Sequence, residues 1–257
     1  VLAPAAMRRG TILLNIPVTS GARVRGGIKS QISLAITLKE NEELLVRQSY
    51  LQSSSLSSQT ATRWLLDHKR PFTSLAAGLA FLTQIRGQGE ITTVSAVRDG
   101  FSELNTITLA SGTACVLQPR ALAAVVQPIG QPVRITSHWR IFSLNAWLTM
   151  QLRYLVFHGP ADLIVKGGRG VRVEAAQAGR LLGQNQLIGF SPDLSYSVSR
   201  TETFWPYFLG REPLLKDRVM MGEGVLIIEE APQSSRDGKP RRSIELVVDA
   251  ILKLFGL

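Results

Sequence analysis

Residues 155–165 read Leu-Val-Phe-His-Gly-Pro-Ala-Asp-Leu-Ile-Val, which is two apolar runs separated by a glycine and a proline. Short apolar runs bounded by turn-forming residues are typical of strands in the interior of a β-protein. A matching order occurs at 82–91, where Gly87 and Gly89 follow Leu-Thr-Gln-Ile-Arg and precede the next strand-like run. Glycines and prolines punctuate the rest of the chain in the same way, and we therefore predict an all-β fold.

Other segments share this habit. Residues 32–38 and 104–109 alternate polar and apolar side chains with the period of two that a half-buried strand requires. Shorter runs of the same kind occur at 171–174 and 196–199, and 225–228 is a continuous apolar run of the buried-strand type. We expect a strand in each of these places.

An internal repeat is visible in three passages, each with apolar residues, a glutamine, a small or turn-forming residue and another apolar run. The passages are 45–51, 115–122 and 181–188. Their glutamines, Gln48, Gln118 and Gln184, recur at intervals of about 70 residues. A near-constant period indicates stacked copies of one supersecondary unit. We therefore predict three tandem small β-sandwich repeats in a closed, pseudo-threefold, prism-like arrangement that hides the sheet edges, with an open stack as the alternative.

The predicted organisation has five parts. They are a divergent first β repeat (1–59), a helical linker (60–72), a second repeat (73–150), a third repeat (151–232) and a basic linker with a C-terminal helix (233–257). The linker is predicted because 60–68, Thr-Ala-Thr-Arg-Trp-Leu-Leu-Asp-His, reads as a short helix.

The end of the chain predicts an amphipathic helix over 243–255, where Ser243 can cap the first turn and Gly256 follows the last. Apolar residues at helical spacing form one face, namely Ile244, Val247, Val248, Ile251 and Phe255. This face packs either on the domain or on a partner or membrane surface, which makes the segment a candidate partner-docking helix.

Composition limits the class of protein. The 257 residues are 45% apolar and 19% charged, which indicates a folded chain with a substantial core. No apolar run approaches the roughly 18 residues that span a bilayer, so we expect a soluble or peripheral protein without a transmembrane segment. The single cysteine, Cys115, lies in an apolar stretch and predicts a buried structural thiol in a reducing compartment.

The net charge of +10 is unevenly distributed. Residues 1–39 hold six basic side chains and no carboxylate, and a second basic cluster lies in the turn-rich segment 236–242. Such clusters favour phosphate backbones or anionic lipid surfaces, although solvating charge alone is the alternative. The candidate contacts with RNA or an anionic surface are Arg8, Arg9, Arg23, Arg25, Lys29, Arg236, Lys239, Arg241 and Arg242.

Motifs of common enzymes are not found. The chain has no Gly-x-Ser-x-Gly elbow, and Lys-Gly-Gly-Arg-Gly at 166–170 lacks the Lys-Ser/Thr ending of a phosphate-binding loop, so we interpret it as a hairpin turn. His68, His138 and His158 are far apart in the sequence and have no cysteine partners, which argues against a metal site. We therefore predict no catalytic residue, no cofactor and no metal.

Of two further patterns, the first argues against an acid–base site and the second has two interpretations. Adjacent acidic pairs such as Glu42 and Glu43 point to opposite faces of a strand and cannot work as one acid–base dyad. Trp139, Arg140 and Trp147 interleave aromatic and basic residues, which suits either stacking on bases beside phosphates or packing between repeats with flanking surface arginines.

The chain resembles the altered inheritance of mitochondria protein 24 family, mainly over residues 75–231. The resemblance is carried by Ile-Arg-Gly-Gln-Gly-Glu-Ile at 85–91, by 155–165 and by Gly-Glu-Gly-Val-Leu-Ile-Ile-Glu at 222–229. It implies a triplicated fold in which each copy is similar to the small β-sandwich of the trp RNA-binding attenuation protein. The first copy departs most, because Arg-Gly-Gly-Ile at 25–28 only loosely replaces the Gly-x-Gly turn.

The resemblance also implies a function and a location. We expect a non-enzymatic mitochondrial factor, on the matrix side or peripheral to the inner membrane, that supports inner-membrane organisation and respiratory-complex or assembly functions by protein–protein contacts. The alternative, which rests on charge, is a mitochondrial ribosome-associated factor that binds rRNA or ribosomal proteins through its basic patches. An enzyme or small-ligand binder is a third hypothesis, supported only by the general capacity of β-sandwiches to hold ligands.

Overall fold

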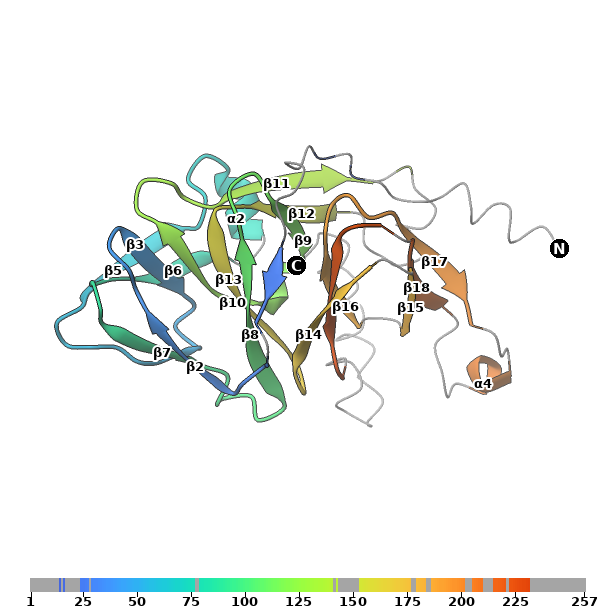
Figure 1. Ribbon diagram of the computed structural model, residues 1–257, viewed down its shortest axis with the longest axis horizontal. Coiled ribbons are helices and arrows are strands. Elements are labelled where there is room, and N and C mark those ends of the chain that lie inside the picture. The colour runs from blue at the N-terminus through green and yellow to red at the C-terminus, as the bar shows by residue number, and fades with distance from the viewer. Residues whose placement is uncertain are drawn as a thin grey trace.

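The structure is a computed structural model, and Figure 1 shows its course. It describes Leu14, Ile16 and Phe142 together with 24–27, 29–76, 79–140, 153–176, 179–183, 186–201, 205–209, 215–220 and 222–231. Almost all described elements are strands, and they form four antiparallel sheets. The all-β prediction is therefore confirmed.

Two large sheets lie in the middle of the molecule. The seven-stranded sheet has the order β1 (Arg25–Gly26), β8 (Ser102–Leu109), β13 (Ala161–Gly168), β10 (Leu122–Pro128), β3 (Glu42–Val46), β6 (Ala80–Arg86) and β5 (Gln59–Leu65). The six-stranded sheet has the order β11 (Arg134–Trp139), β12 (Arg153–His158), β9 (Ala114–Leu117), β16 (Leu187–Phe190), β19 (Val225–Glu229) and β14 (Val171–Ala175).

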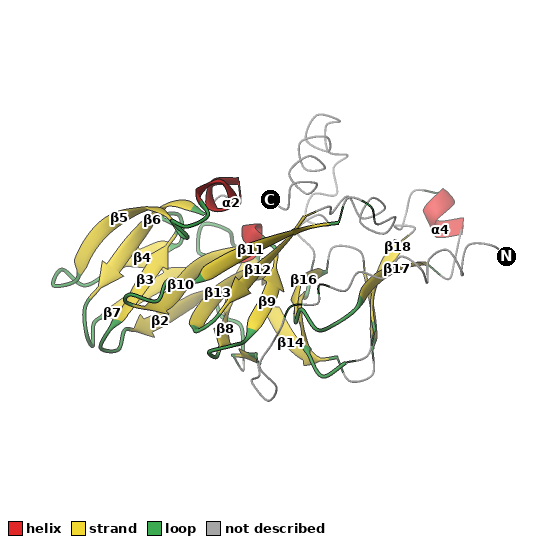
Figure 2. Ribbon diagram, turned by 90° about the horizontal axis from the view of Figure 1, so that it is seen from above, coloured by secondary structure: helices red, strands yellow, loops and turns green. Residues whose placement is uncertain are grey.

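Two small sheets lie outside the large ones, one at each end of the row of layers in Figure 2. One contains β2 (Ser33–Thr37), β7 (Ile91–Ser95) and β4 (Leu51–Ser53), and the other β15 (Arg180–Gly183), β18 (Leu215–Val219) and β17 (Tyr196–Arg200). The helices in the described part of the chain are short, namely α2 (Pro71–Ala76), the 3-10 turn η1 (Pro119–Ala121) and α4 (Trp205–Phe208).

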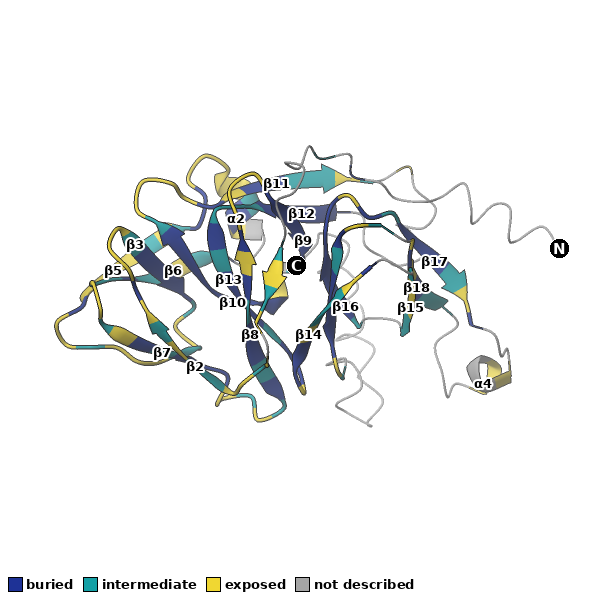
Figure 3. Cartoon of the chain, in the orientation of Figure 1, coloured by how far each residue is buried: buried dark blue, intermediate teal, exposed yellow. Residues whose placement is uncertain are grey.

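Three apolar cores fill the spaces between the four layers. On β3, Leu45 faces the core between the large sheets, whereas Leu44 faces the core under the β2–β7–β4 sheet. On β9, Cys115 faces the central core and Val116 the core under the β15–β18–β17 sheet. The central strands of both large sheets are therefore buried on both faces, which explains the continuous apolar runs in strands such as β3, β9 and β10. Figure 3 shows the buried residues concentrated in these layers.

The stretch 155–165 contributes one strand to each large sheet. β12 and β13 are joined at Gly159 and Pro160, but β12 pairs with β9 and β11 while β13 pairs with β8 and β10. A Cβ atom on Gly159 would lie 2.4 Å from the carbonyl oxygen of Ala110, so only glycine fits at this crossing. The strand–turn–strand prediction is confirmed, and the turn is a passage between layers.

Strands six positions apart along the chain have equivalent neighbours. β7 lies between β2 and β4, β13 between β8 and β10, and β19 between β14 and β16. In the same way, β6 lies between β5 and β3, β12 between β11 and β9, and β18 between β17 and β15. We call β2–β7, β8–β13 and β14–β19 the first, second and third units.

A register shift also recurs in all three units. It lies between Leu51 and Ser53 on β4, between Leu122 and Ala124 on β10, and between Leu187 and Gly189 on β16. Units are joined where β10 pairs with β3 and where β16 pairs with β9. A closed prism would need a third junction between β4 and β15, but in the described part of the chain these strands belong to separate sheets.

Two local predictions are wrong. The predicted helix at 60–68 is replaced over most of its length by β5, which pairs along β6, and the nearest helix, α2, begins only at Pro71. Residues 166–170 do not close a hairpin, because β13 pairs with β8 and β10 whereas β14 pairs with β19. The predicted C-terminal helix lies outside the described residues.

Candidate functional site

The structure describes only two of the residues predicted to contact RNA or an anionic surface. Arg25, on β1, and Lys29 are both exposed. The others, Arg8, Arg9, Arg23, Arg236, Lys239, Arg241 and Arg242, lie outside the described residues. The same holds for Ile244, Val247, Val248, Ile251 and Phe255 of the candidate docking helix. These sites remain predictions.

A polar cluster on the β11–β12 hairpin was not predicted. We call Thr136, His138 and His158 the histidine cluster. The hydroxyl oxygen of Thr136 lies 2.9 Å from Nε2 of His158 and 3.1 Å from Nε2 of His138. Antiparallel pairing, with Arg134 opposite His158, brings the two histidines together although they are distant in the sequence.

Positive charge surrounds this cluster. Burial lowers the pKa of His138, and the charges of Arg140 and Arg70 lower it further. Burial also lowers the pKa of His158, with additional effects of Arg134, His138 and Arg70. Both rings are therefore neutral at pH 7. A hydroxyl and two imidazoles among three guanidinium groups suit an anion, because charge-assisted hydrogen bonds to an anion are strong.

The exposed tryptophan of β11 belongs to a different surface. Trp139 is 47% exposed, and the guanidinium of Arg153 lies 5.5 Å from its ring centroid. Arg153 also donates a hydrogen bond of 2.7 Å to the hydroxyl of Ser137. Because side chains alternate along a strand, Ser137 and Trp139 face away from His138. Trp139 therefore does not line the surface of the histidine cluster, and Trp147 lies outside the described residues.

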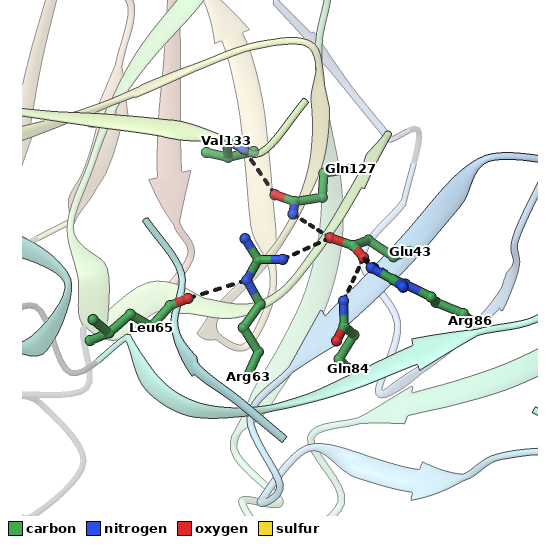
Figure 4. Close-up of polar contacts among 7 residues, drawn as sticks. All are labelled: Glu43, Arg63, Leu65, Gln84, Arg86, Gln127 and Val133. Carbon is green, nitrogen blue, oxygen red and sulfur yellow. Dashed lines mark hydrogen bonds and ion pairs between the residues drawn. The ribbon is translucent and has the colours of Figure 1, made fainter. Parts of the chain in front are cut away.

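Glu43 on β3 is a buried charge with many hydrogen-bond partners, drawn in Figure 4. Its carboxylate accepts hydrogen bonds from Arg63 at 3.0 Å, from Arg86 at 2.6 Å and from Gln127 at 2.7 Å. Gln84 donates to the same group. These partners come from β5, β6 and β10, so a single carboxylate joins four neighbouring strands of the seven-stranded sheet.

This network holds Glu43 in its charged form. Burial by itself would raise the pKa of Glu43, but hydrogen bonds from Gln127, Arg86 and Gln84 and the charge of Arg63 outweigh it and hold the pKa below its ordinary value. A carboxylate with a lowered pKa and several donors is a poor proton acceptor. Its amide partner Gln127 in turn accepts a hydrogen bond from the backbone of Val133.

Cys115 is fully buried in the central core, as the sequence predicts. Burial raises the pKa of its thiol to about 12, so a thiolate does not form at neutral pH. The described residues also contain no group of three His, Cys, Asp or Glu side chains that could hold a metal ion. Of the three histidines, the structure joins His138 to His158 through Thr136.

Exposed apolar side chains occur in all three hairpin connections. We call Phe72, Leu75, Phe142, Trp205, Phe208 and Leu209 the aromatic connections. Phe72 lies between β5 and β6, Phe142 between β11 and β12, and Trp205 between β17 and β18. Phe72 is 85% and Trp205 70% exposed. Where large exposed apolar groups gather into one patch, they mark docking surfaces.

Sequence reasoning missed Glu43 and the histidine cluster for one reason. The partners of Glu43 come from three other strands, and His138 meets His158 only through strand pairing. No local pattern contains this information. Of the aromatic connections, only the one that contains Trp205 follows a predicted strand, at 196–199, whereas Phe72 lies at the end of the predicted helical linker.

None of the helices in the described part of the chain has the length and hydropathy that a membrane-spanning helix requires.

Comparisons with known proteins add information on the fold. No protein-family model matches the chain. A search of curated proteins finds no match either. A crystal structure of a protein from Streptococcus pyogenes is similar, with a TM-score of 0.53 and 12% sequence identity over 83% of this chain and 96% of that chain. At this identity the similarity concerns the fold alone, and it extends over nearly the whole of the Streptococcus pyogenes protein.

Proposed function

We propose that this chain is a non-enzymatic assembly or organising factor that acts by protein–protein contacts through the aromatic connections. The observation that carries the proposal is their recurrence: the β5–β6, β11–β12 and β17–β18 connections each present at least one large exposed apolar side chain. Tryptophan and other aromatic residues dominate the binding energy of protein interfaces. The chemistry of the described residues agrees with this, since Glu43 and Cys115 are both held in unreactive states.

The cellular setting is part of the same proposal and rests on the sequence resemblance. We place the protein in mitochondria, on the matrix side or peripheral to the inner membrane, with protein complexes of that membrane as partners. The candidate docking helix at 243–255 would add a second apolar surface.

The architecture behind this function is also a proposal. We propose that the three units are copies of one six-stranded sandwich, because strand pairing and the register shift recur in each. The units cover 33–95, 102–168 and 171–229. The predicted ranges divide the chain differently, because 73–150 holds β6–β11, taken from two units, and 151–232 holds β12–β19, which is the end of the second unit and all of the third. Strand pairing joins the first unit to the second and the second to the third, and this favours the open stack over the closed prism.

The experiment compares sedimentation of mitochondrial extract containing the full chain or a variant with Trp205→Ser and Phe208→Ser. We expect the unaltered chain to migrate with inner-membrane complexes, with or without nuclease, and the variant to migrate as free protein. Lys69→Ser, an exposed polar change in another connection, serves as the control. Migration of the unaltered chain as free protein, or equal migration of both chains, would overturn the proposal.

A second candidate function is favoured by the histidine cluster. Arg70, Arg134 and Arg140 around Thr136 suit the phosphate groups of rRNA. Contact with about three phosphates of a single strand would make the logarithm of affinity fall with a slope near −2 against the logarithm of salt concentration. Titration of a labelled rRNA fragment, with Arg134→Gln as the test variant, checks this. A flat salt response would exclude it.

A further inference from the structure

The two junctions between units have the same geometry. At the first, Val46, the last residue of β3, pairs with Ala124, which directly follows the register shift of β10. At the second, Leu117, the last residue of β9, pairs with Gly189, which directly follows the register shift of β16. Each junction therefore sets the end of one strand opposite an equivalent small residue.

A backbone hydrogen bond repeats at the same place. The amide of Arg47, which follows β3, donates to the carbonyl of Ala123 at 3.1 Å. The amide of Gln118, which follows β9, donates to the carbonyl of Ile188 at 2.9 Å. Both acceptors lie within the register shift of the neighbouring strand. The junction is thus a defined interface that the chain builds twice.

The two halves of a third junction are present at opposite ends of the molecule. β15 ends at Gly183, the counterpart of Val46 and Leu117, and Ser53 follows the register shift of β4. In the described part of the chain, β15 pairs with β18 and β4 pairs with β7, which leaves one edge of each without a neighbouring strand. Gln52 and Ser53 are exposed on β4, as are Arg180 and Leu181 on β15.

Other sheet edges do not share this property. β5, β11 and β17 are equivalent strands, and each ends its sheet. β4 and β15 differ. The strands equivalent to β4 are β10 and β16, those equivalent to β15 are β3 and β9, and these pair as β10 with β3 and as β16 with β9. The small sheets that they end have three strands each, whereas the inner sheets have seven and six. If the β4 edge of one small sheet joined the β15 edge of the other, the two would form a six-stranded layer like the six-stranded inner sheet.

We propose that a second copy of this chain docks head to tail, with its β4 antiparallel to β15 and its Ser53 opposite Gly183. The contact uses different surfaces on the two copies, so it repeats to form a ring or a filament. Backbone hydrogen bonds between strands supply the attraction, as in other cases of strand addition to a free edge. This inference does not depend on the proposed function.

Cysteine cross-linking tests the pairing. Ser53→Cys and Gly183→Cys are made in separate full-length chains, and each variant is checked for native circular dichroism. The added Cβ at Gly183 meets the end of the flexible Gln186 side chain at 3.0 Å, which can move aside. Native Cys115 is buried and does not compete.

Under mild oxidation, we expect the mixture of the two variants to form disulfide-linked dimers, and each variant alone to remain uncrosslinked. Thr62→Cys on the exposed edge strand β5, mixed with Gly183→Cys, is the matched control and should give no dimer. A mixture that yields no dimer, or a control that yields as much, would overturn the proposal. Light scattering on the unaltered chain supplies a second readout: its mass should rise with concentration, and Ser53→Lys should abolish the rise. A constant monomer mass would count against the pairing.

Discussion

Glu43 accepts a hydrogen bond of 2.7 Å from the side-chain amide of Gln127, directly opposite it across the β3–β10 pairing. This contact lies on the junction between the first and second units. Arg63 and Arg86 hold the same carboxylate from within the first unit. A buried charge therefore ties the two units together at the point where their sheets merge.

Replacing Glu43 with glutamine should destabilise the protein strongly. The change leaves two guanidinium groups without their anion, and loss of one partner of a buried ion pair costs about 3 kcal/mol of unfolding free energy. Urea denaturation measures the effect. Glu42→Gln is the matched control, because both side-chain contacts of Glu42 are with the exposed Lys39: a 3.0 Å hydrogen bond from its backbone amide, for which a glutamine carbonyl can substitute, and a 3.9 Å ion pair worth less than about 1 kcal/mol. Equal losses in the two variants would contradict a structural role for Glu43.

Acid should weaken the fold through the same residue. The pKa of Glu43 in the folded state lies below its ordinary value of 4.5, so its contribution is complete above pH 4.5 and is lost as the pH falls through the folded pKa. Urea midpoints between pH 7 and pH 3 should fall more steeply for the unaltered chain than for Glu43→Gln. If the urea midpoints of the two chains fell in parallel with pH, other carboxylates would dominate the loss of stability in acid.

The histidine cluster has its own dependence on pH. The folded pKa values of His138 and His158 lie below 6.5, so the unfolded chain takes up protons first as the pH falls below 6.5 and stability declines down to the folded values. Nuclear magnetic resonance of the imidazole nitrogens measures both values. Thr136→Val, which removes the shared hydroxyl, should change the tautomers of both rings. Titration of either histidine at 6.5 or above would refute the burial of this cluster.

Cys115 should be inert in the folded protein. Its thiol lies in the central core with a pKa raised to about 12, so a thiol reagent at pH 8 finds neither access nor thiolate. We expect negligible labelling in buffer and complete labelling in concentrated urea. Ala61→Cys, on an exposed position of β5, is the positive control. Rapid labelling of the unaltered chain would place Cys115 nearer the surface.

The strands could be predicted where local pattern and long-range pairing agree. Alternation at 104–109 and the apolar run at 225–228 correspond to β8 and β19, because burial on one or both faces leaves its period in the sequence. The helix at 60–68 was wrong because the local preference of this segment is overridden by pairing with β6, where Trp64 packs on Phe81 with ring centroids 5.3 Å apart.

Sites defined by distant pairing were out of reach of the sequence. Glu43 looked like half of an uninformative acidic pair, and its partners lie on β5, β6 and β10. The mutual approach of His138 and His158 depends on the register of β11 against β12. By contrast, the burial of Cys115 followed from its apolar neighbours alone.

Neighbouring units share a sheet, and this has a consequence for how the chain folds. The seven-stranded sheet takes β3, β5 and β6 from the first unit and β8, β10 and β13 from the second. In solenoids, too, each repeat contacts only its neighbours, but each repeat there is a complete supersecondary unit stacked on the next. Here, loss of one unit would strip strands from a sheet that the next unit needs. The chain should therefore melt in one cooperative step, and a truncation at a unit boundary should leave an aggregating fragment rather than a shorter protein.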